Sequence, residues 1–314
     1  MGDVPVERIE ACNNCGARDA EVTSRSRDFE YDTCSNEFTF VRCRACQLIY
    51  LRDRPVVAAL GIIYPSSYQP YEFDEILSPL VTRARNLVQG RKVAPVAARA
   101  PADALVVDVG CGGGAFLRIL KRLGPPGWRL IGVDFAEDAI RSLAKAGIEG
   151  RQGRFESMDW DLPPPDVVVM NQVIEHLDDP AAVVGRAFAL LKPGGILMLE
   201  TPSVDAWDAR LFWKRHWGGW HTPRHWTLYT PATLTALLRR SGFEVVETKA
   251  LLSPTFWLQS VHHWLLDRPR LRRLAPFFDI THIAPLCLTT GLDLFQLGLT
   301  GKTSNFRIVA MKPT

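Results

Sequence analysis

The stretch LVVDVGCGGGAF, residues 105–116, decides the fold of this chain. A short β-branched apolar run enters a glycine turn with Gly110, Gly112 and Gly114 at alternate positions, and the AFLRILKRLG that follows places an apolar stripe on one helical face: Phe116, Ile119, Leu120 and Leu123. Glycine has no Cβ, so a ligand can approach the backbone N–H groups at the start of that helix. The stretch therefore predicts a strand, a glycine turn and a helix that together form a ligand site.

The alternation of strand and helix continues toward the C-terminus. Apolar runs at residues 130–134, 166–171 and 194–202 are typical of further strands, and Asp179 with Pro180 forms a cap and first-turn pair for a helix between two of them. This order predicts a parallel sheet with crossover helices. Two late strands, at 243–250 and 304–312, are expected to run antiparallel to the rest.

Changes in local composition along the sequence predict three parts. Residues 1–55 are short, polar and rich in cysteine, and residues 56–103 form a connector whose portion from 79 to 101 is basic and contains no acid. Residues 104–314 form the α/β domain, with residues 251–301 as a helical insertion. We expect the first part and the α/β domain to have separate cores.

Composition narrows the class of protein. Of 314 residues, 47% are hydrophobic and 23% are charged, which excludes a disordered chain or a coiled coil. The net charge of +3 is too small to require a nucleic-acid partner. The first residues lack a basic stretch followed by an apolar one, so we expect no secretory signal and a cytoplasmic protein, in which closely spaced cysteines bind metal or act in redox chemistry.

Two acidic residues near the glycine turn indicate which kind of ligand binds there. Asp134 ends the second strand, where a carboxylate accepts hydrogen bonds from ribose hydroxyls. Asp108 precedes the first glycine by two residues and would repel a pyrophosphate, but it suits a cation such as the amino or sulfonium group of S-adenosylmethionine. With Ala115, the turn also satisfies a permissive dinucleotide fingerprint, so a nicotinamide or flavin oxidoreductase remains an alternative.

The chain resembles the class I S-adenosylmethionine-dependent methyltransferases in the motifs VDVGCGGG at 107–114, GVD at 132–134, NQVIEHLDDP at 171–180 and LKPGG at 191–195. The resemblance covers about residues 104–250 and 303–312 and implies a Rossmann-like α/β fold. It also implies a set of cofactor-binding residues, which are Asp108, Gly110, Gly112, Gly114, Asp134, Phe135, Phe155, Glu156, Asn171 and Gln172. Asp134 would hold the ribose, Phe135, Phe155 and Glu156 would lie by the adenine, and the others would surround the methionine portion.

Four cysteines form the second signal. Cys12 and Cys15 make one knuckle and Cys43 and Cys46 make another, a spacing that predicts a structural Zn²⁺ site in a ribbon. Two redox disulfides are the alternative. The arrangement resembles the N-terminal zinc ribbons of bacterial methyltransferases that act on sugars, polysaccharides and secondary metabolites. That resemblance implies that Tyr64, Tyr68 and Tyr71 reach the mouth of the active site.

The third signal is a segment rich in tryptophan and histidine. Residues 207–226 hold five of the nine tryptophans and three of the seven histidines. The stretch HTPRHWTLYTPATL, at 221–234, resembles a segment of the same zinc-containing methyltransferases, and a histidine there can remove the acceptor's proton. The predicted catalytic residues are His221, His225, His176, Glu175 and Tyr229. The alternative is a purely structural role, in which His221 and His225 hold the loop by hydrogen bonds and Glu175 and His176 cap or hydrogen-bond the adjacent backbone.

Residues 251–301 combine apolar helices with the basic run Arg268, Arg270, Arg272 and Arg273. Leu288, Leu292, Phe295 and Leu299 recur on one helical face, which predicts a core or homodimer surface. Pro285, Asp293 and Gln296 argue against a membrane span. The alternative is a peripheral contact of residues 256–300 with lipid or with a lipid-linked acceptor.

Together these features predict an enzyme that transfers a methyl group from S-adenosylmethionine to a small-molecule, sugar or lipid-linked glycan acceptor. An RNA methyltransferase whose zinc ribbon binds RNA keeps the same chemistry, but the low net charge does not favour nucleic acid as a partner. An alternative of another class is a non-catalytic zinc-dependent binding protein. It is disfavoured because the cofactor motifs are complete.

Overall fold

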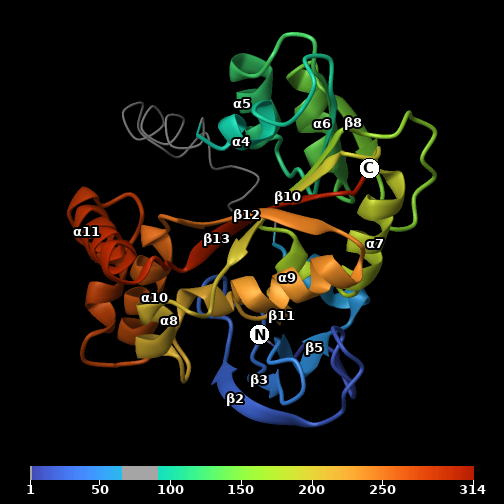
Figure 1. The fold of residues 1–314 in the computed structure, drawn as a ribbon. Coiled ribbons are helices and arrows are strands. Elements are labelled where there is room, and N and C mark those ends of the chain that lie inside the picture. Colours follow the sequence, from blue (N-terminus) through green and yellow to red (C-terminus); the bar gives the residue numbers. More distant parts are fainter. Residues whose placement is uncertain (1, 66–90) are drawn as a thin grey trace.

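The computed structural model describes residues 2–65 and 91–314. Tyr68, Tyr71 and residues 66–90 of the connector lie outside the described residues. A seven-stranded sheet with the order β12-β13-β10-β9-β6-β7-β8 forms the centre of the α/β part (Figure 1). Its strands are β12 (Glu244–Leu251), β13 (Asn305–Met311), β10 (Ile196–Pro202), β9 (Val167–Asn171), β6 (Leu105–Val109), β7 (Arg129–Asp134) and β8 (Glu149–Gln152). This arrangement confirms the predicted Rossmann-like α/β class.

One expectation about strand direction is wrong. Strand β13 runs antiparallel to both of its neighbours, β10 and β12, so β12 runs parallel to β10. Only β13, and not the late pair, opposes the rest of the sheet. Helix α9 (Pro231–Arg240) precedes β12 and acts as a crossover, which returns the chain to the same edge of the sheet before β12 begins.

Helices cover both faces of the sheet because successive strand residues point to opposite sides. Val106, Val167 and Met198 pack with α4 (Val93–Ala97), α5 (Ala115–Leu123) and α6 (Glu137–Lys145). Val107, Val168 and Leu197 pack with α7 (Pro180–Leu190) and α9 on the other face. Figure 1 shows α4, α5 and α6 on the side away from the N-terminal part.

The N-terminal part shares its cores with the rest of the chain. Its strands β2 (Ala20–Ser26), β3 (Phe38–Cys43) and β4 (Ile49–Leu51) form a four-stranded sheet that is completed by β11 (Thr227–Leu228), while β1 (Val6–Arg8) pairs with β5 (Asp53–Pro55). Cys12 and Cys43 belong to the same hydrophobic cluster as Leu105. The expectation of separate cores is therefore wrong, because the β-forming residues between the cysteine pairs bury their apolar side chains against residues 217–229.

Short helices connect these units. They are η1 (Val57–Ala59), α1 (Leu60–Ile63), η3 (Ile174–His176), α8 (Trp207–Phe212) and η4 (Gly218–Trp220). Residues 251–301 form α10 (Pro254–Leu266), η5 (Arg272–Phe277) and α11 (Ile283–Thr300), which lie beside α8 at one side of the molecule (Figure 1). Most of residues 252–301 are thus helical.

Helix α11 turns its polar side inward. Thr289, Asp293 and Gln296 are buried, whereas the stripe predicted as core or dimer surface is exposed: Leu288 by 61%, Phe295 by 60% and Leu299 by 63%. The inward side is held by hydrogen bonds, because Asp293 accepts from the Ser253 N–H at 2.6 Å and Gln296 accepts from the Trp207 N–H at 2.9 Å. Within the described part of the chain, α11 is long and apolar enough to cross a membrane, by length and composition only. In this chain the stripe is not core.

Candidate active site

The glycine turn between β6 and α5 requires glycine for two reasons. Gly110, Gly112 and Gly114 have φ values of 65°, 50° and 78°, a region that side chains with a Cβ rarely adopt. A Cβ at Gly110 would also lie 2.6 Å from a methyl carbon of Val173, and one at Gly114 would overlap Leu143. The turn thus brings bare backbone to the edge where β6 ends, as the sequence predicts.

Two carboxyl groups flank this turn. Asp134 accepts hydrogen bonds from the N–H groups of Gly112 and Ala136, both at 2.9 Å, and so holds the turn in place. Asp108 is buried behind it, and burial together with the neighbouring charge of Asp134 raises the pKa of Asp108 to about 8. The positive charge of Lys92 acts in the opposite direction and lowers the pKa of Asp108. Asp108 is therefore poised to ionise when a cation binds beside it.

A cavity of about 930 Å³ connects the glycine turn with the histidines. It brings together three parts of the chain: the sheet, the N-terminal part through Glu30 and Tyr64, and α10 through Phe256 and Gln259. The predicted site residues that line it are Asp108, Gly110, Gly112, Asp134, Phe135, Phe155, Glu156, Asn171, Gln172, His176, His221 and His225. Gly114, Glu175 and Tyr229 do not line it; Glu175 and Tyr229 are buried behind the histidines.

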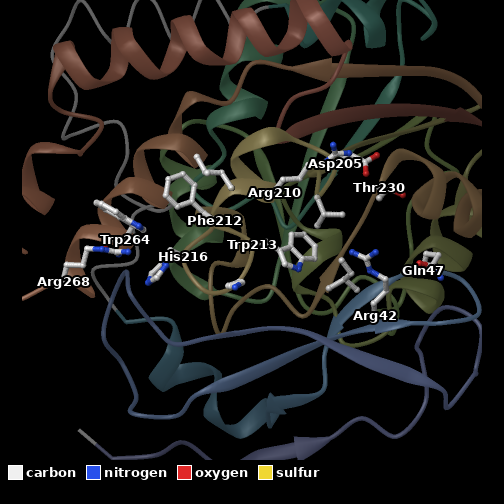
Figure 2. A pocket seen from close by; sticks show the side chains of 14 residues that line it. Arg42, Gln47, Asp205, Arg210, Phe212, Trp213, His216, Thr230, Trp264 and Arg268 are labelled. Carbon is white, nitrogen blue, oxygen red and sulfur yellow. The ribbon is translucent and has the colours of Figure 1, made fainter. Parts of the chain in front are cut away.

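A second cavity, of about 740 Å³, lies where β3, β4 and α8 face one another (Figure 2). Arg42, Trp213 and Arg210 line it, together with Trp264 and Arg268 from the helical insertion. None of the predicted cofactor-binding, catalytic or metal-binding residues, all of which the structure describes, lines this cavity. The larger cavity is therefore the candidate active site.

Asn171 and Gln172 stand at the end of β9 on the cavity wall. Both polar side-chain atoms of Asn171 are buried and have no hydrogen-bond partner among the described residues, so they are available to a ligand. The Gln172 side chain instead donates to Asn305 Oδ1 at 3.0 Å. Of the two, Asn171 has the better geometry for holding a polar group of a ligand.

Three histidines lie close together at the end of the cavity opposite the glycine turn. The ring centroids of His176 and His225 are 4.7 Å apart, those of His221 and His225 are 4.8 Å apart, and those of His176 and His221 are 6.0 Å apart. Burial, with the charge of His221, lowers the pKa of His176 to about 3, and burial, with the charges of the other two histidines, lowers the pKa of His225 well below its ordinary value. His176 and His225 are therefore neutral at neutral pH.

His221 is fixed by the N-terminal part of the chain. Its Nδ1 lies 2.7 Å from Glu30 Oε2, although 191 residues separate them. Burial alone would raise the pKa of Glu30, but the charge of His221 and their hydrogen bond lower it. A carboxylate on one ring nitrogen orients an imidazole and stabilises its protonated form.

An ion pair in the interior holds this loop against the N-terminal part. Arg224 and Asp28 are both buried, and Nη2 of the arginine lies 2.9 Å from Oδ2 of the aspartate. Arg224 also donates to the backbone oxygen of Ile63 at 2.7 Å. Asp28 accepts further hydrogen bonds from the N–H groups of Tyr31 and Thr33, both at 3.0 Å. The pair thus positions the segment that carries Glu30.

Several residues of this site were not predicted from the sequence. Glu30, Tyr31 and Lys92 line the cavity, and Asp28 and Arg224 support it. Glu30 and Tyr31 belong to FEYD, residues 29–32, between the two cysteine pairs, and the two acids of that run are its local signal. Lys92, which is paired with Glu200, lies in no motif. Tyr64 was predicted at the mouth, and its hydroxyl lies 3.0 Å from His176 Nδ1.

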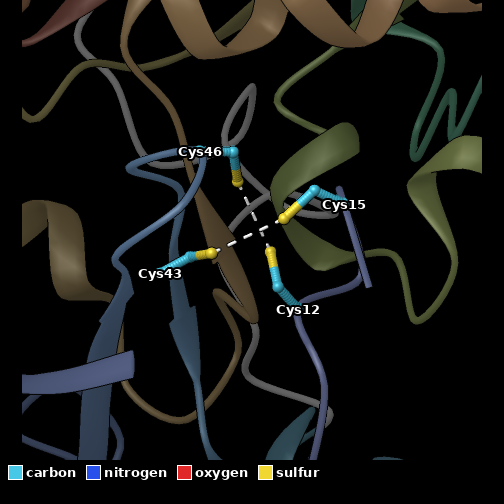
Figure 3. Close-up of side chains that lie close together, drawn as sticks. All are labelled: Cys12, Cys15, Cys43 and Cys46. Carbon is cyan, nitrogen blue, oxygen red and sulfur yellow. Dashed lines mark hydrogen bonds between the residues drawn. The ribbon is translucent and has the colours of Figure 1, made fainter. Parts of the chain in front are cut away.

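The four predicted metal-binding cysteines come together (Figure 3). Cys12 Sγ is 3.6 Å from Cys46 Sγ, and Cys15 Sγ is 3.6 Å from Cys43 Sγ. Zn–S bonds of about 2.3 Å in a tetrahedron place sulfur atoms about 3.8 Å apart, so the cluster fits Zn²⁺. A disulfide needs about 2.05 Å, and all of these cysteines are free.

Comparisons with known proteins agree with this geometry. Residues 81–248, more than half of the chain, match the family described as a methyltransferase domain. A ubiquinone biosynthesis O-methyltransferase of Xanthomonas axonopodis is 32% identical over 171 residues, which cover 48% of this chain and 67% of that enzyme. A probable S-adenosylmethionine-dependent methyltransferase of Mycolicibacterium smegmatis is 31% identical over 145 residues, which cover 46% of this chain and 53% of that protein. The chain thus spans about half to two thirds of the length of these relatives.

Among solved structures, human N-acetylserotonin methyltransferase in complex with S-adenosylmethionine has a TM-score of 0.51, at 17% identity, over 83% of this chain and 60% of that one. At that identity the likeness shows the fold alone. The family match removes the oxidoreductase and the non-catalytic alternatives. Its agreement with the seven-stranded sheet and the glycine turn shows that the chain belongs to the class I S-adenosylmethionine-dependent methyltransferases.

Proposed function

We propose that this enzyme methylates a hydroxyl group of a small-molecule or glycan-type acceptor. The observation that carries the proposal is the single cavity that joins the glycine turn to the histidines, because a methyl donor at one end and an acceptor at the other would meet in it. The named activity of the Xanthomonas relative, O-methylation in ubiquinone biosynthesis, supports oxygen as the methylated atom and a small molecule as the acceptor.

The donor end of the cavity suits S-adenosylmethionine. The glycine turn admits the methionine portion to bare backbone, and Asp108 offers a charge for its ammonium or sulfonium. The two polar side-chain atoms of Asn171, which have no hydrogen-bond partner among the described residues, can bind its polar groups. We assign Asp134, which ends β7, to the ribose and Phe135, which begins the next loop, to the adenine. Phe155 and Glu156 line the same end.

At the acceptor end we assign proton removal to His221. When bound, S-adenosylmethionine supplies an activated methyl group: the acceptor oxygen forms the new C–O bond, and the electron pair of the broken C–S bond stays on sulfur. The hydroxyl proton passes to His221, and Glu30, 2.7 Å from its Nδ1, stabilises the resulting imidazolium. His225 is a weaker candidate because it is buried and its Nδ1 lies against the Gly219 carbonyl oxygen at 2.8 Å. Tyr229 lies behind the cavity.

The helical insertion favours an acceptor that is itself held at a membrane surface. The outer side of α11 exposes leucine and phenylalanine, and Arg268, Arg270, Arg272 and Arg273, in the segment that joins α10 to α11, carry positive charge. An apolar helix face beside clustered arginines matches the apolar and anionic layers of a lipid surface. We therefore propose that α11 and the arginines dock on anionic lipid, and that the acceptor is lipid-linked.

Two measurements test the proposed activity. Calorimetry should show micromolar-scale binding of S-adenosylmethionine and S-adenosylhomocysteine that is lost in Gly112→Val, because the valine blocks the turn. Gly185→Ala is the matched control, since a Cβ at this helical glycine would contact nothing within 4 Å. Release of S-adenosylhomocysteine should then be followed with hydroxylated aromatic, sugar and lipid-linked glycan acceptors. Turnover on RNA but on none of these would refute the proposed acceptor class.

A further inference from the structure

Three side chains at the acceptor end form a set of metal ligands that is separate from the four cysteines. Glu175 and His176 come from η3, and His225 comes from the loop before β11. One potential ligand atom from each residue lies within 4.8 Å of those of the other two. We propose that Glu175, His176 and His225 bind a divalent transition-metal ion in the active-site cavity.

Hydrogen bonds fix both imidazoles in the form that binds metal. His176 Nδ1 lies 3.0 Å from the Arg224 carbonyl oxygen, and His225 Nδ1 lies 2.8 Å from the Gly219 carbonyl oxygen. A carbonyl oxygen only accepts, so in each ring Nδ1 carries the hydrogen and Nε2 carries the lone pair. The Tyr64 hydroxyl, 3.0 Å from the same Nδ1 of His176, then acts as a second acceptor of that hydrogen. An imidazole whose other nitrogen donates to a carbonyl is the usual arrangement of a histidine that ligates a metal.

The carboxylate is the independent observation that points to a cation. Glu175 is completely buried, and its Oε2 accepts a hydrogen bond from Thr201 Oγ1 at 2.9 Å. Its Oε1 is buried without a hydrogen-bond partner among residues 2–65 and 91–314, and lies 4.0 Å from His225 Nε2. A buried carboxylate oxygen without a partner is costly. A metal ion between this oxygen and the two imidazoles would supply the missing partner.

The distances are within reach of one ion. Bonds from Zn²⁺ to nitrogen or oxygen are about 2.0–2.2 Å long, and in a tetrahedral site they place the ligand atoms about 3.3–3.6 Å apart. His225 Nε2 and Glu175 Oε1, at 4.0 Å, lie about 0.5 Å beyond this separation. Since no pair exceeds 4.8 Å, side-chain movements of about 1 Å bring all three atoms into coordination.

The proposed ion would have an open position on the cavity side. Two histidines and one carboxylate are three protein ligands, the number found at catalytic rather than structural zinc sites. His176 lines the cavity, so the remaining position faces the space assigned to the acceptor. Resting on the proposed function, the ion would bind the acceptor oxygen and favour its deprotonated form, which makes it a better nucleophile. The substrate class is then a hydroxyl compound that binds metal.

Metal content tests this site without any knowledge of the acceptor. The full-length protein is saturated with Zn²⁺ and separately with Co²⁺, freed of excess metal, and its content is measured by mass spectrometry. We expect two ions per chain in the wild type and one in Glu175→Gln and in His225→Ala. In Co²⁺ protein the sulfur-to-metal charge-transfer band of the cysteine site should remain in both variants, while the visible d–d absorption of the second ion disappears.

His262→Ala is the matched control. His262 lines the same cavity, and its Nδ1 lies 2.8 Å from the Ala275 carbonyl oxygen, but it is not part of the three-residue cluster. This variant should keep two ions. Glu175→Gln keeps the size of the side chain and an oxygen for Thr201, so it preserves the fold, which retained binding of S-adenosylhomocysteine would verify. One ion in the wild type, or two in Glu175→Gln and His225→Ala, would overturn the inference while leaving the proposed methyl transfer intact.

Discussion

Removal of metal from the four cysteines should damage the whole enzyme. The perturbation is Cys43→Ser, which removes one thiolate of the cluster. Cys43 is buried in the same hydrophobic cluster as Leu105 of the central sheet and Tyr229 of the loop that carries the histidines. Loss of the knuckle therefore exposes apolar surface on both sides, and it frees β3 and β4. Glu30 lies in the loop between β2 and β3, so this loss also disturbs the segment that carries Glu30.

The size of the effect follows from two numbers. Structural Zn²⁺ contributes about 10–16 kcal/mol in small zinc-binding peptides, whereas the net stability of a folded protein is about 5–15 kcal/mol. Even if shared packing keeps half of the structure in place, a loss of about 5 kcal/mol should lower Tm by about 10 °C or more. Because Glu30 and Tyr64 line the cavity, the active site should lose order in the same transition.

The assay follows unfolding and ligand binding in one set of samples. Trp217 and Trp220 are buried against the N-terminal sheet, so tryptophan fluorescence reports this interface. Calorimetry measures the affinity for S-adenosylhomocysteine. Cys287→Ser is the control, because Cys287 is exposed and outside the cluster. If Cys43→Ser retained the wild-type Tm and affinity for S-adenosylhomocysteine, the two parts would have to be independent, contrary to the shared cores.

Three further predictions concern single contacts. Arg224→Met should lower the free energy of unfolding by about 3–5 kcal/mol in urea titrations, because Asp28 is then left charged and buried, and Asp28→Asn added to it should restore part of the loss. Burial alone would raise the pKa of Asp28, but the hydrogen bond and charge of Arg224 lower it from 3.8 to about 2. The ion pair therefore stabilises the fold fully above pH 3.8, and this stabilisation disappears as the pH falls toward 2. The free energy of unfolding should depend less on pH over that interval in Arg224→Met. Burial raises the pKa of Asp108 to about 8, so its carboxyl group is protonated at pH 7 without ligand. Binding of the cationic S-adenosylmethionine should therefore release a proton. Calorimetry in buffers of different ionisation enthalpy should detect this release in the wild type and no release in Asp108→Asn. Phe295→Glu should weaken sedimentation with anionic vesicles at unchanged Tm because the side chain is 60% exposed. Leu123→Glu, at a leucine of α5 that is 52% exposed and distant from α11, should bind as the wild type does. Wild-type binding by Phe295→Glu, or an equal loss in both variants, would contradict the docking proposal.

Local signals in the sequence predicted local structure well. The run from Leu105 through the glycine turn to α5 was readable because a strand, a tight turn and a helix are each set by neighbouring residues. The two cysteine pairs also predicted their own cluster, since the ligands of a metal site keep a characteristic spacing. The direction of β12 was not readable, because it depends on the crossover through α9 rather than on the residues of β12.

Long-range contacts account for most of what the sequence did not predict. Glu30 meets His221 across 191 residues, and Arg224 meets Asp28 across 196, so no pattern within either segment indicates the pair. The same limit applies to α11. Its leucine stripe predicted a buried face, but Asp293 and Gln296 find partners in Ser253 and Trp207, which only the tertiary structure brings close. Satisfying these buried polar groups sets the orientation of the helix.

The completion of the N-terminal sheet by β11 has a consequence for biosynthesis. The first 55 residues leave the ribosome early, yet the strand that pairs with β4 is not made until residue 228, and the tryptophans that cover the sheet come only slightly before it. Until then β4 has an open edge and uncovered apolar side chains, which favour aggregation of the nascent chain. Metal binding by the cysteines can shape this segment early but cannot cover it. The N-terminal part should therefore depend on chaperones during translation. It should also fail to fold when it is fused to another enzyme that lacks residues 217–228 of this chain.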